Sequence, residues 1–344
     1  MSGLSSSAAR SAERLAASRV GSRFVLDPLL DWGWRRYRAN GTTPALAFRA
    51  MRASFLDPTT SFGRLEVRAS EEYPPLAFAP APSGLVSDSH EAVLEELVRD
   101  GFAVLPALLS VADCDDIEAC ARAATCTLIG AGAGTPAAAR FDETAPLARR
   151  YEVPEADLLA CTAVQALLGD ESLLRLAQEY LGASPVHDLV AGWWSAPGAG
   201  SASQAAQLFH FDLDRPRFLK LFVYLSDVGP ETGPHAYVRG THRELPVEFR
   251  ADRRYSDEEV ERRFKDEVVR IPGPRGTVFL ADTRGLHKGE PVISGHRLIF
   301  QLELASSLFG GTYTRPVLHA PAPGLSEATH RFPSAYRRFT VVED

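Results

Sequence analysis

The amino-acid sequence predicts a mainly β protein with flanking helices, and two observations lead to this fold class. From Pro185 onward, short β-rich segments alternate with Gly and Pro turns, a spacing typical of an antiparallel sandwich or barrel. Between residues 87 and 182 the pattern is helical instead. The β-rich segments are "PVHDLVAGWW", "AQLFHFDLD", "FLKLFVYLSD", "HAYVRG", "GTVFLAD" and "RLIFQLELA". We therefore expect a β core with the preceding helices packed on one of its sheets.

The first elements of the helical part are marked by their end signals. The stretch "SHEAVLEELVRDG" predicts a helix that ends at Gly101, and "FAVLP" predicts a short strand after it. "SVAD" at 110–113 has capping-box spacing and predicts the start of a helix that runs to about Ala124.

Three more helices are predicted further along the chain. Residues 130–150 are interpreted as a flexible loop, and two helices follow it, from Pro154 to about Leu168 and from Glu171 to Leu181. Within the β-rich part, "SDEEVERRFKDEVV" (256–269) predicts a helical insertion that begins with a capping box. Its charges indicate a solvated helix face, and a substrate lid is the alternative.

Composition narrows the class of protein. The chain has 344 residues, is 45% hydrophobic and carries a net charge of −7, without the basic clusters that nucleic-acid binding needs. No apolar run approaches the ~20 residues of a membrane span. The four cysteines form no CxxC pair, so we interpret them as free thiols and expect a cytoplasmic protein.

The stretch "LFHFDLD" (208–214) holds the first candidate metal ligands. In a strand, residues two apart point to one face, so His210 and Asp212 share a face. A His and a carboxylate on one side can hold a divalent cation, and burying them otherwise is costly. The best third ligand is His287, at the end of a strand, and Arg297 follows ten residues later.

These residues together indicate more than each one alone. Two His and one carboxylate form the facial triad of non-haem Fe(II) oxygenases, which leaves three coordination positions open. An Arg on the neighbouring strand is suited to hold a carboxylate bidentately. The alternative for Arg297 is an ion pair with a structural Asp or Glu.

From about residue 87 to residue 304 the chain resembles the phytanoyl-CoA dioxygenase-like branch of the Fe(II)/2-oxoglutarate-dependent oxygenases. The resemblance lies in "VRDGFAVLPALLS", "FHFDLD", "YLSDVGPETGPHAYVRGTHR", "GTVFLADTRGLHKG" and "HRLIFQLEL". It implies a double-stranded β-helix, a cupin-like jelly-roll. It also implies that His210, Asp212 and His287 bind Fe(II), that Arg297 binds the far carboxylate of 2-oxoglutarate, and that O₂ is the second co-substrate.

The resemblance also sets the expected domains. Residues 1–86 would form a helical or irregular extension, residues 87–310 the oxygenase jelly-roll with its N-terminal helices, and residues 311–344 a C-terminal extension packed on the core. The loops 130–156 and 196–206 would line the substrate pocket.

One position departs from the family pattern. Relatives often carry Ser or Thr two residues after the distal His, where this chain has Gly289. Lys220 and Tyr224 lie on one face of "FLKLFVYL" and are candidates to assist 2-oxoglutarate binding, although Lys220 could equally extend to solvent. His235 and His242 are interpreted as structural hydrogen-bonding residues.

The function that follows is a 2-oxoglutarate-dependent oxygenase that hydroxylates a small metabolite, lipid or natural-product intermediate. Asp212 disfavours halogenation, because halogenases of this type lack the carboxylate ligand. Desaturation, cyclisation and epimerisation stay open, as does the oligomeric state. The two rivals are a non-catalytic metal-binding jelly-roll and a cupin-like metalloenzyme that does not use 2-oxoglutarate.

Overall fold

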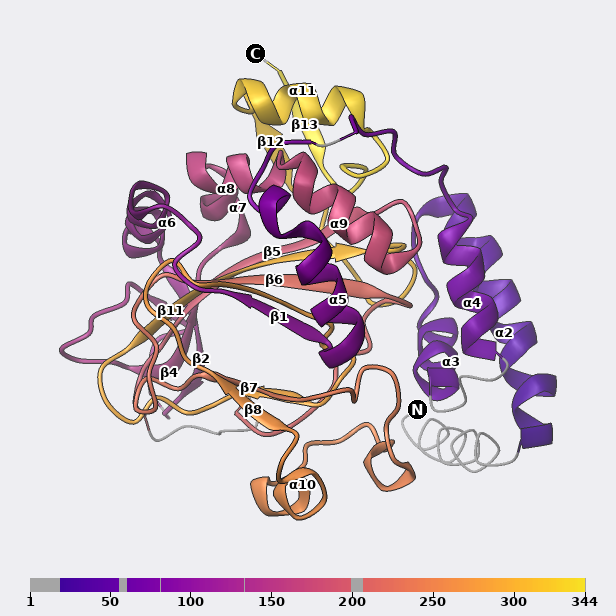
Figure 1. Ribbon diagram of the computed structural model, residues 1–344, viewed down its shortest axis with the longest axis horizontal. Coiled ribbons are helices and arrows are strands. Elements are labelled where there is room, and N and C mark those ends of the chain that lie inside the picture. Colours follow the sequence, from indigo (N-terminus) through magenta and orange to yellow (C-terminus); the bar gives the residue numbers. More distant parts are fainter. Residues whose placement is uncertain (1–18, 56–60, 81, 133, 199–206, 344) are drawn as a thin grey trace.

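Two β-sheets lie face to face and form the core of the protein (Figure 1). The structure, a computed structural model, describes residues 19–55, 61–80, 82–132, 134–198 and 207–343. The larger sheet has the strand order β1-β9-β6-β11-β5-β4-β2-β3, and the smaller has the order β10-β7-β8. The larger sheet comprises β1 (Phe102–Leu105), β2 (Cys126–Ala131), β3 (Ala138–Ala139), β4 (Ala148–Glu152), β5 (Val186–Ser195), β6 (Phe218–Tyr224), β9 (Val278–Ala281) and β11 (Arg297–Ala305). The smaller comprises β7 (His235–Val238), β8 (Val268–Ile271) and β10 (His287–Gly289).

An apolar cluster between the sheets joins them. Phe222, Phe279 and Ile299 of the larger sheet pack with Tyr237 and Ile271 of the smaller one. All pairings in both sheets are antiparallel. The predicted jelly-roll class, mainly β with flanking helices, is confirmed.

Helices cover the outer face of the larger sheet. They are α5 (His90–Asp100), α6 (Val111–Ala123), α7 (Glu155–Leu159), α8 (Thr162–Leu168) and α9 (Glu171–Leu181). Figure 1 shows α5 and α9 lying across this sheet, on the side away from β7 and β8. Leu173 and Leu181 of α9 are buried in one cluster with Leu221 of β6 and Phe300 of β11. This contact orients β6 and β11, because the opposite face of each strand must then point between the sheets.

The N-terminal helices and the C-terminal segment also pack on the core. The N-terminal helices are α2 (Arg19–Asn40), α3 (Ala45–Phe55) and α4 (Ser61–Ser70), and their apolar residues share a cluster with Phe218, Ala305 and Phe309. The C-terminal segment holds β12 (Val317–His319), α11 (Pro323–Arg331) and β13 (Thr340–Val342), and it packs on the helical layer. The domain boundaries near residues 86 and 310 stay a prediction. In the described parts of the chain, no helix is long and apolar enough to cross a membrane.

The predicted helix ends agree with the structure at three places. Gly101 ends α5 in the left-handed conformation, with a φ of +89°, as its sequence position predicts. Ser110 caps α6 by accepting from the backbone N–H of Asp113. Ser256 and Glu259 form the capping box of α10 (Asp257–Phe264).

Several predicted elements were wrong in extent. The helix expected over 154–168 is two helices, α7 and α8, with Cys161 in extended backbone between them. The helix expected over 256–269 stops at Phe264, because Val268 and Val269 enter β8 and pair with β7. The loop expected over 130–150 contains β3 and the start of β4, because the backbone of both pairs with neighbouring strands. Only β3 consists of alanines, which have little β propensity.

Candidate metal centre

The segment that carries His210 and Asp212 is not a regular strand. It is tied instead to the strand and turn that carry His287: His210 and His287 exchange backbone hydrogen bonds of 2.9 and 2.8 Å, and the N–H of Asp212 donates to the carbonyl of Thr283 at 2.8 Å. Phe209 and Phe211 are buried in a cluster with residues of β7 and α10. The predicted alternation of faces therefore holds although the predicted strand does not.

The turn that delivers His287 is braced by a buried carboxylate. Asp282 is fully buried and accepts hydrogen bonds from the guanidinium of Arg284 and, at 2.8 Å, from the hydroxyl of Tyr180. Arg284 also reaches Glu66 of α4 at 3.1 Å. The N-terminal helices thus support the turn between β9 and β10.

The three predicted ligands converge. The Nε2 atom of His210 lies 3.7 Å from Asp212 Oδ1, and the Nε2 atom of His287 lies 3.5 Å from Asp212 Oδ2. One ligand atom from each of the three residues lies within 4.8 Å of the other two. A divalent metal ion between them would be close to all three.

The hydrogen bonds of both imidazoles set their tautomers. His210 Nδ1 lies 2.9 Å from the carbonyl of Leu208, and His287 Nδ1 lies 3.0 Å from the carbonyl of Gly285. A carbonyl only accepts, so each Nδ1 carries the proton and each Nε2 lone pair is free to bind a metal. Burial lowers the pKa of His210 to about 3 and also lowers that of His287, so both rings are neutral near pH 7. This donor set fits Fe(II).

Lys220 meets the ligand carboxylate directly. Its ammonium group donates to Asp212 Oδ2 at 2.7 Å and lies 3.5 Å from Glu303 Oε2. Burial by itself raises the pKa of Asp212. Lys220, and after it the two imidazoles, lower this pKa by more than burial raises it, so the pKa lies well below its ordinary value. Lys220 is buried, so the alternative that it extends to solvent is wrong. A contact of Lys220 with 2-oxoglutarate stays a prediction.

Arg297 is a buried cation without an anion. It begins β11 opposite Ser195 of β5 and donates to the Ser195 hydroxyl at 3.3 Å, while its Nε atom is buried with no hydrogen-bond partner. Within the described residues, no acidic side chain forms an ion pair with it. The structural ion pair that was the alternative for this residue is therefore absent from the described part of the chain, and burial lowers the pKa of the guanidinium.

The side-chain hydrogen bonds of Tyr224, His235 and His242 differ. The Tyr224 hydroxyl donates to the carbonyl of Ile271 at 2.8 Å and accepts from the backbone N–H of His235 at 3.0 Å, so its role at 2-oxoglutarate stays a prediction. His242 hydrogen-bonds the carbonyl of Val98 at 3.3 Å, as expected of a structural residue. His235 does not match that expectation, because its ring makes no hydrogen bond with the described residues. Each of the two rings has one buried nitrogen without a partner, Nε2 in His235 and Nδ1 in His242.

Comparison with known proteins decides the family. The family model described as "Phytanoyl-CoA dioxygenase (PhyH)" matches residues 97–298, more than half of the chain. The chain belongs to the phytanoyl-CoA dioxygenase family. The assignment of Fe(II), with 2-oxoglutarate and O₂ as co-substrates, is thereby confirmed at the level of this family. A search of the curated proteins finds none that matches the chain.

Solved structures similar to this phytanoyl-CoA dioxygenase family member are distant. The 2-oxoglutarate-dependent epimerase SnoN from nogalamycin biosynthesis is 18% identical, with 63% of this chain and 83% of that chain covered and a TM-score of 0.47. The carbocyclase SnoK from the same biosynthesis is 17% identical, with 65% and 86% covered and a TM-score of 0.47. HygX from Streptomyces hygroscopicus, with nickel and 2-oxoglutarate bound, is 19% identical, with 65% and 89% covered and a TM-score of 0.45. We therefore rest the function on the family and on the site geometry.

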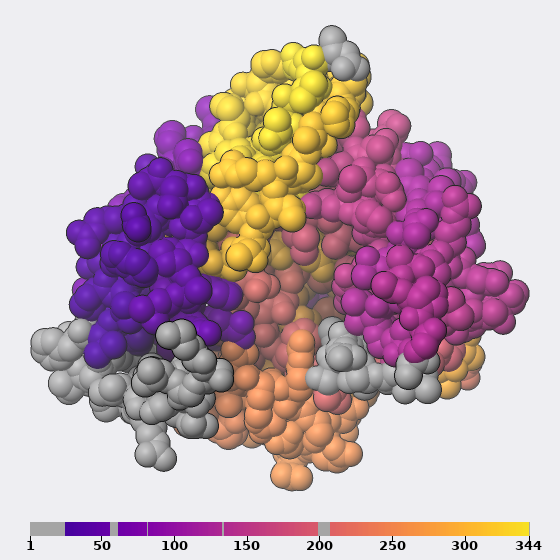
Figure 2. Space-filling model, turned by 180° about the vertical axis from the view of Figure 1, so that it is seen from behind, coloured from indigo at the N-terminus to yellow at the C-terminus, as the bar shows by residue number. Residues whose placement is uncertain are grey.

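The surface is hollowed where several parts of the chain meet. Seen from behind, the hollow lies between the N-terminal helices (indigo), the C-terminal segment (yellow) and the part of the chain around α10 (orange) (Figure 2). The side chain of Asp212 is 19% exposed, so solvent reaches this candidate ligand. Of the two loops expected to line the pocket, part of the first is β4, and residues 199–206 of the second lie outside the described residues.

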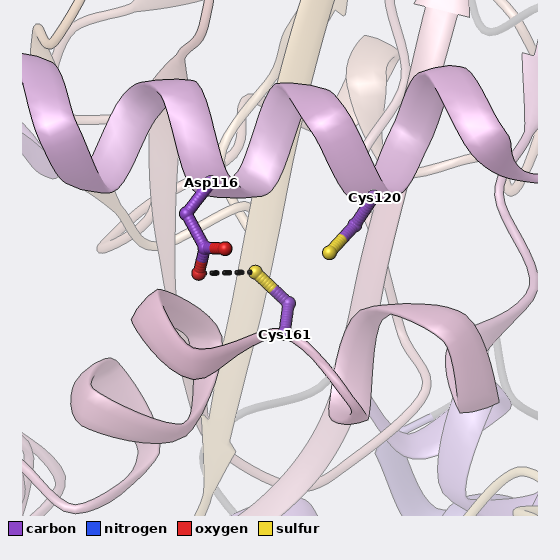
Figure 3. Close-up of side chains that lie close together, drawn as sticks. All are labelled: Asp116, Cys120 and Cys161. Atoms are coloured by element: carbon purple, nitrogen blue, oxygen red, sulfur yellow. Dashed lines mark hydrogen bonds between the residues drawn. The ribbon is translucent and has the colours of Figure 1, made fainter.

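A second group of metal-ligating side chains has a structural explanation. Asp116, Cys120 and Cys161 point toward one another from α6 and from the residue before α8 (Figure 3). Asp116 Oδ2 accepts from the backbone N–H of Ala163 at 2.8 Å and from the Cys161 thiol at 3.1 Å. Asp116 therefore caps α8, and burial raises the pKa of both thiols, which keeps them protonated. All four cysteines are free, as expected.

Proposed function

We propose that this protein is an Fe(II)/2-oxoglutarate-dependent hydroxylase. It inserts one oxygen atom of O₂ into an unactivated C–H bond of a small metabolite, lipid or natural-product intermediate, and the other enters succinate as 2-oxoglutarate loses CO₂. The observation that carries the proposal is Arg297, a buried cation without an anion whose guanidinium stands over Gly289, two residues after the candidate ligand His287.

The chain's own residues prepare the metal site. Two backbone carbonyls fix the imidazole tautomers, and Lys220 holds the carboxylate of Asp212. Fe(II) bound to these residues supplies the activation of O₂, and the facial triad leaves three positions for co-substrate and O₂. Asp212 occupies the ligand position that halogenases of this type leave to a halide, which disfavours halogenation.

Arg297 supports 2-oxoglutarate over other uses of a jelly-roll metal site. A buried guanidinium is costly unless an anion pairs with it, and a carboxylate can pair with it bidentately. Neither a structural metal site nor a cupin-like enzyme without 2-oxoglutarate needs such a carboxylate anchor. The unpaired Arg297 therefore favours the 2-oxoglutarate-dependent reaction over both rivals.

The test is the dependence of succinate release on 2-oxoglutarate in a screen of small metabolites, with Arg297→Ala and Arg297→Lys beside the natural protein. A hydrogen bond to a charged group contributes about 1.5–3 kcal/mol, so Arg297→Ala should raise the KM for 2-oxoglutarate at least tenfold. Arg297→Lys keeps the charge without the bidentate geometry, so its KM for 2-oxoglutarate should fall between those of the natural protein and of Arg297→Ala. Metal affinity should stay unchanged in both variants. An unchanged KM would reject the role, and a collapsed melting temperature would instead show that Arg297 is needed for the fold.

A further inference from the structure

His235 is a buried imidazole that the fold leaves unused. The residue begins β7 and is 6% exposed, and its Nε2 atom has no hydrogen-bond partner among the described residues. Buried polar groups are nearly always paired, so an unpaired nitrogen deep inside a site calls for an explanation. Nearby, the Nε atom of Arg297 is likewise buried without a partner.

The strand pairing places His235 beside a metal ligand. In the small sheet, His235 lies opposite Gly289 of β10, and Tyr237 lies opposite His287. Residues directly opposite each other, and residues two apart, present their side chains on one face. His235 and His287 therefore share a face, and their rings stack with centroids 5.4 Å apart and planes 15° from parallel.

Aromatic neighbours hold the His235 ring in this place. Its centroid lies 5.3 Å from that of Phe222 and 5.2 Å from that of Phe279, both on the inner face of the larger sheet. The ring is packed between the two sheets rather than free to turn to solvent. Its position is therefore set before any ligand binds.

Gly289 connects this ring to Arg297. A Cβ atom at Gly289 would lie 3.3 Å from the nearest guanidinium nitrogen of Arg297, so the guanidinium stands over the face of β10 that His235 shares. Gly289 has no side chain of its own to offer there. The imidazole thus lies beside His287 and beside Gly289, over which the Arg297 guanidinium stands, and it borders the space that a metal-chelating 2-oxo acid with a distal carboxylate would occupy.

We propose that His235 is a co-substrate-binding residue whose Nε2–H donates a hydrogen bond to the distal carboxylate of 2-oxoglutarate, next to Arg297. This inference rests on the proposed function. It gives each orphaned nitrogen the same partner, a carboxylate with enough acceptor capacity for both. It also makes the site selective for 2-oxo acids that carry a second carboxylate.

The test measures ligand binding without turnover. The protein is loaded with Mn(II) without oxygen, and dissociation constants are measured for 2-oxoglutarate and for 2-oxopentanoate, which lacks the distal carboxylate. His235→Phe keeps an aromatic ring between Phe222 and Phe279 but removes the donor. It should weaken 2-oxoglutarate binding about tenfold or more and leave 2-oxopentanoate binding unchanged. His235→Gln, which keeps a donor, should lose less affinity for 2-oxoglutarate than His235→Phe.

Gly289→Ser in the His235→Phe background provides a gain-of-binding test. The new hydroxyl would stand beside the Arg297 guanidinium, and φ at Gly289 is not in the left-handed region, so a serine fits the backbone. It should restore part of the lost affinity for 2-oxoglutarate only. Mn(II) affinity and melting temperature are measured for each variant, and His235→Leu replaces His235→Phe if the latter does not fold.

The outcomes separate the two proposals. The inference is overturned if His235→Phe and His235→Leu bind 2-oxoglutarate as the natural protein does while Arg297→Ala weakens binding. It is also overturned if both 2-oxo acids lose affinity equally, because the contact would then lie at the metal-chelating end. If the natural protein does not bind 2-oxoglutarate, or if Arg297→Ala changes nothing, the proposed function itself fails.

Discussion

Replacing Lys220 by Met tests how the metal-free protein tolerates a buried carboxylate at its metal site. Lys220 is paired with Asp212 at 2.7 Å, and the two side chains are 9% and 19% exposed. Removing one partner of a buried pair typically costs about 3–5 kcal/mol, and the partial exposure of Asp212 places this case near 3 kcal/mol. Urea unfolding of the metal-free protein should show that loss in the free energy of unfolding.

Metal should reduce the loss. At a separation of about 5 Å and an effective dielectric constant of 20, a divalent ion and an ammonium group would repel each other by several kcal/mol. The hydrogen bond that orients Asp212 contributes only about 1.5–3 kcal/mol. Repulsion therefore outweighs orientation, so Mn(II) should bind Lys220→Met at least as tightly as it binds the natural protein. With Mn(II) bound, the variant should lose less stability than without it.

Arg338→Met is the matched control. Arg338 is a buried cation paired with Glu155 outside the ligand set, and the two side chains are 1% and 20% exposed. Arg338→Met should lower the free energy of unfolding by the same amount with and without Mn(II). A loss below about 1 kcal/mol in metal-free Lys220→Met, or a tenfold weaker Mn(II) affinity, would refute the reasoning.

Two further predictions concern stability. Burial, followed by Arg338, lowers the pKa of His187 to about 3, so the unfolded chain takes up a proton below about pH 6.5 while the folded protein does not. His187 thus makes stability fall as the pH falls from about 6.5 to 3, by up to about 1.4 kcal/mol per pH unit, and His187→Phe should remove that part of the slope in urea unfolding of the metal-free protein. Equal slopes for the variant and the natural protein would contradict this. Asp116→Ala should lower the free energy of unfolding by about 1 kcal/mol by uncapping α8, and Zn²⁺ should not raise the melting temperature of the natural protein through this cluster. A stabilisation by Zn²⁺ that is lost in Asp116→Ala would show a metal site there instead.

The faces on which His210, Asp212 and Arg297 lie could be predicted from the sequence, because each depends only on the alternation of side chains within its own segment. The alternation of "LFHFDLD" places His210 and Asp212 on one face even though the backbone there is bridged rather than part of a regular strand. Arg297 follows from the alternation of β11, whose apolar face packs on the helices. Neither inference needs the rest of the fold to be known.

The contacts of Lys220 and His235 required the structure. Lys220 meets Asp212 only because β6 passes beside a segment that is not its neighbour in a sheet, and nothing in "FLKLFVYL" names that partner. His235 faces His287 because of the register between β7 and β10, which depends on the turn geometry between distant segments. The strand β4 was missed for the same reason, since nothing in "ARRYE" indicates that it pairs with β2 and β5.

The most direct test of the metal and co-substrate assignment is spectroscopic. Metal-free protein, kept without oxygen, should take up one Fe(II), and adding 2-oxoglutarate should then produce the weak visible metal-to-ligand charge-transfer band of the chelate. The ligand set of His210, Asp212 and His287 requires that Asp212→Ala weaken Fe(II) uptake sharply and lose the band. Full iron occupancy with an unchanged band in Asp212→Ala would remove Asp212 from the ligand set. No band in the iron-loaded natural protein would contradict the use of 2-oxoglutarate.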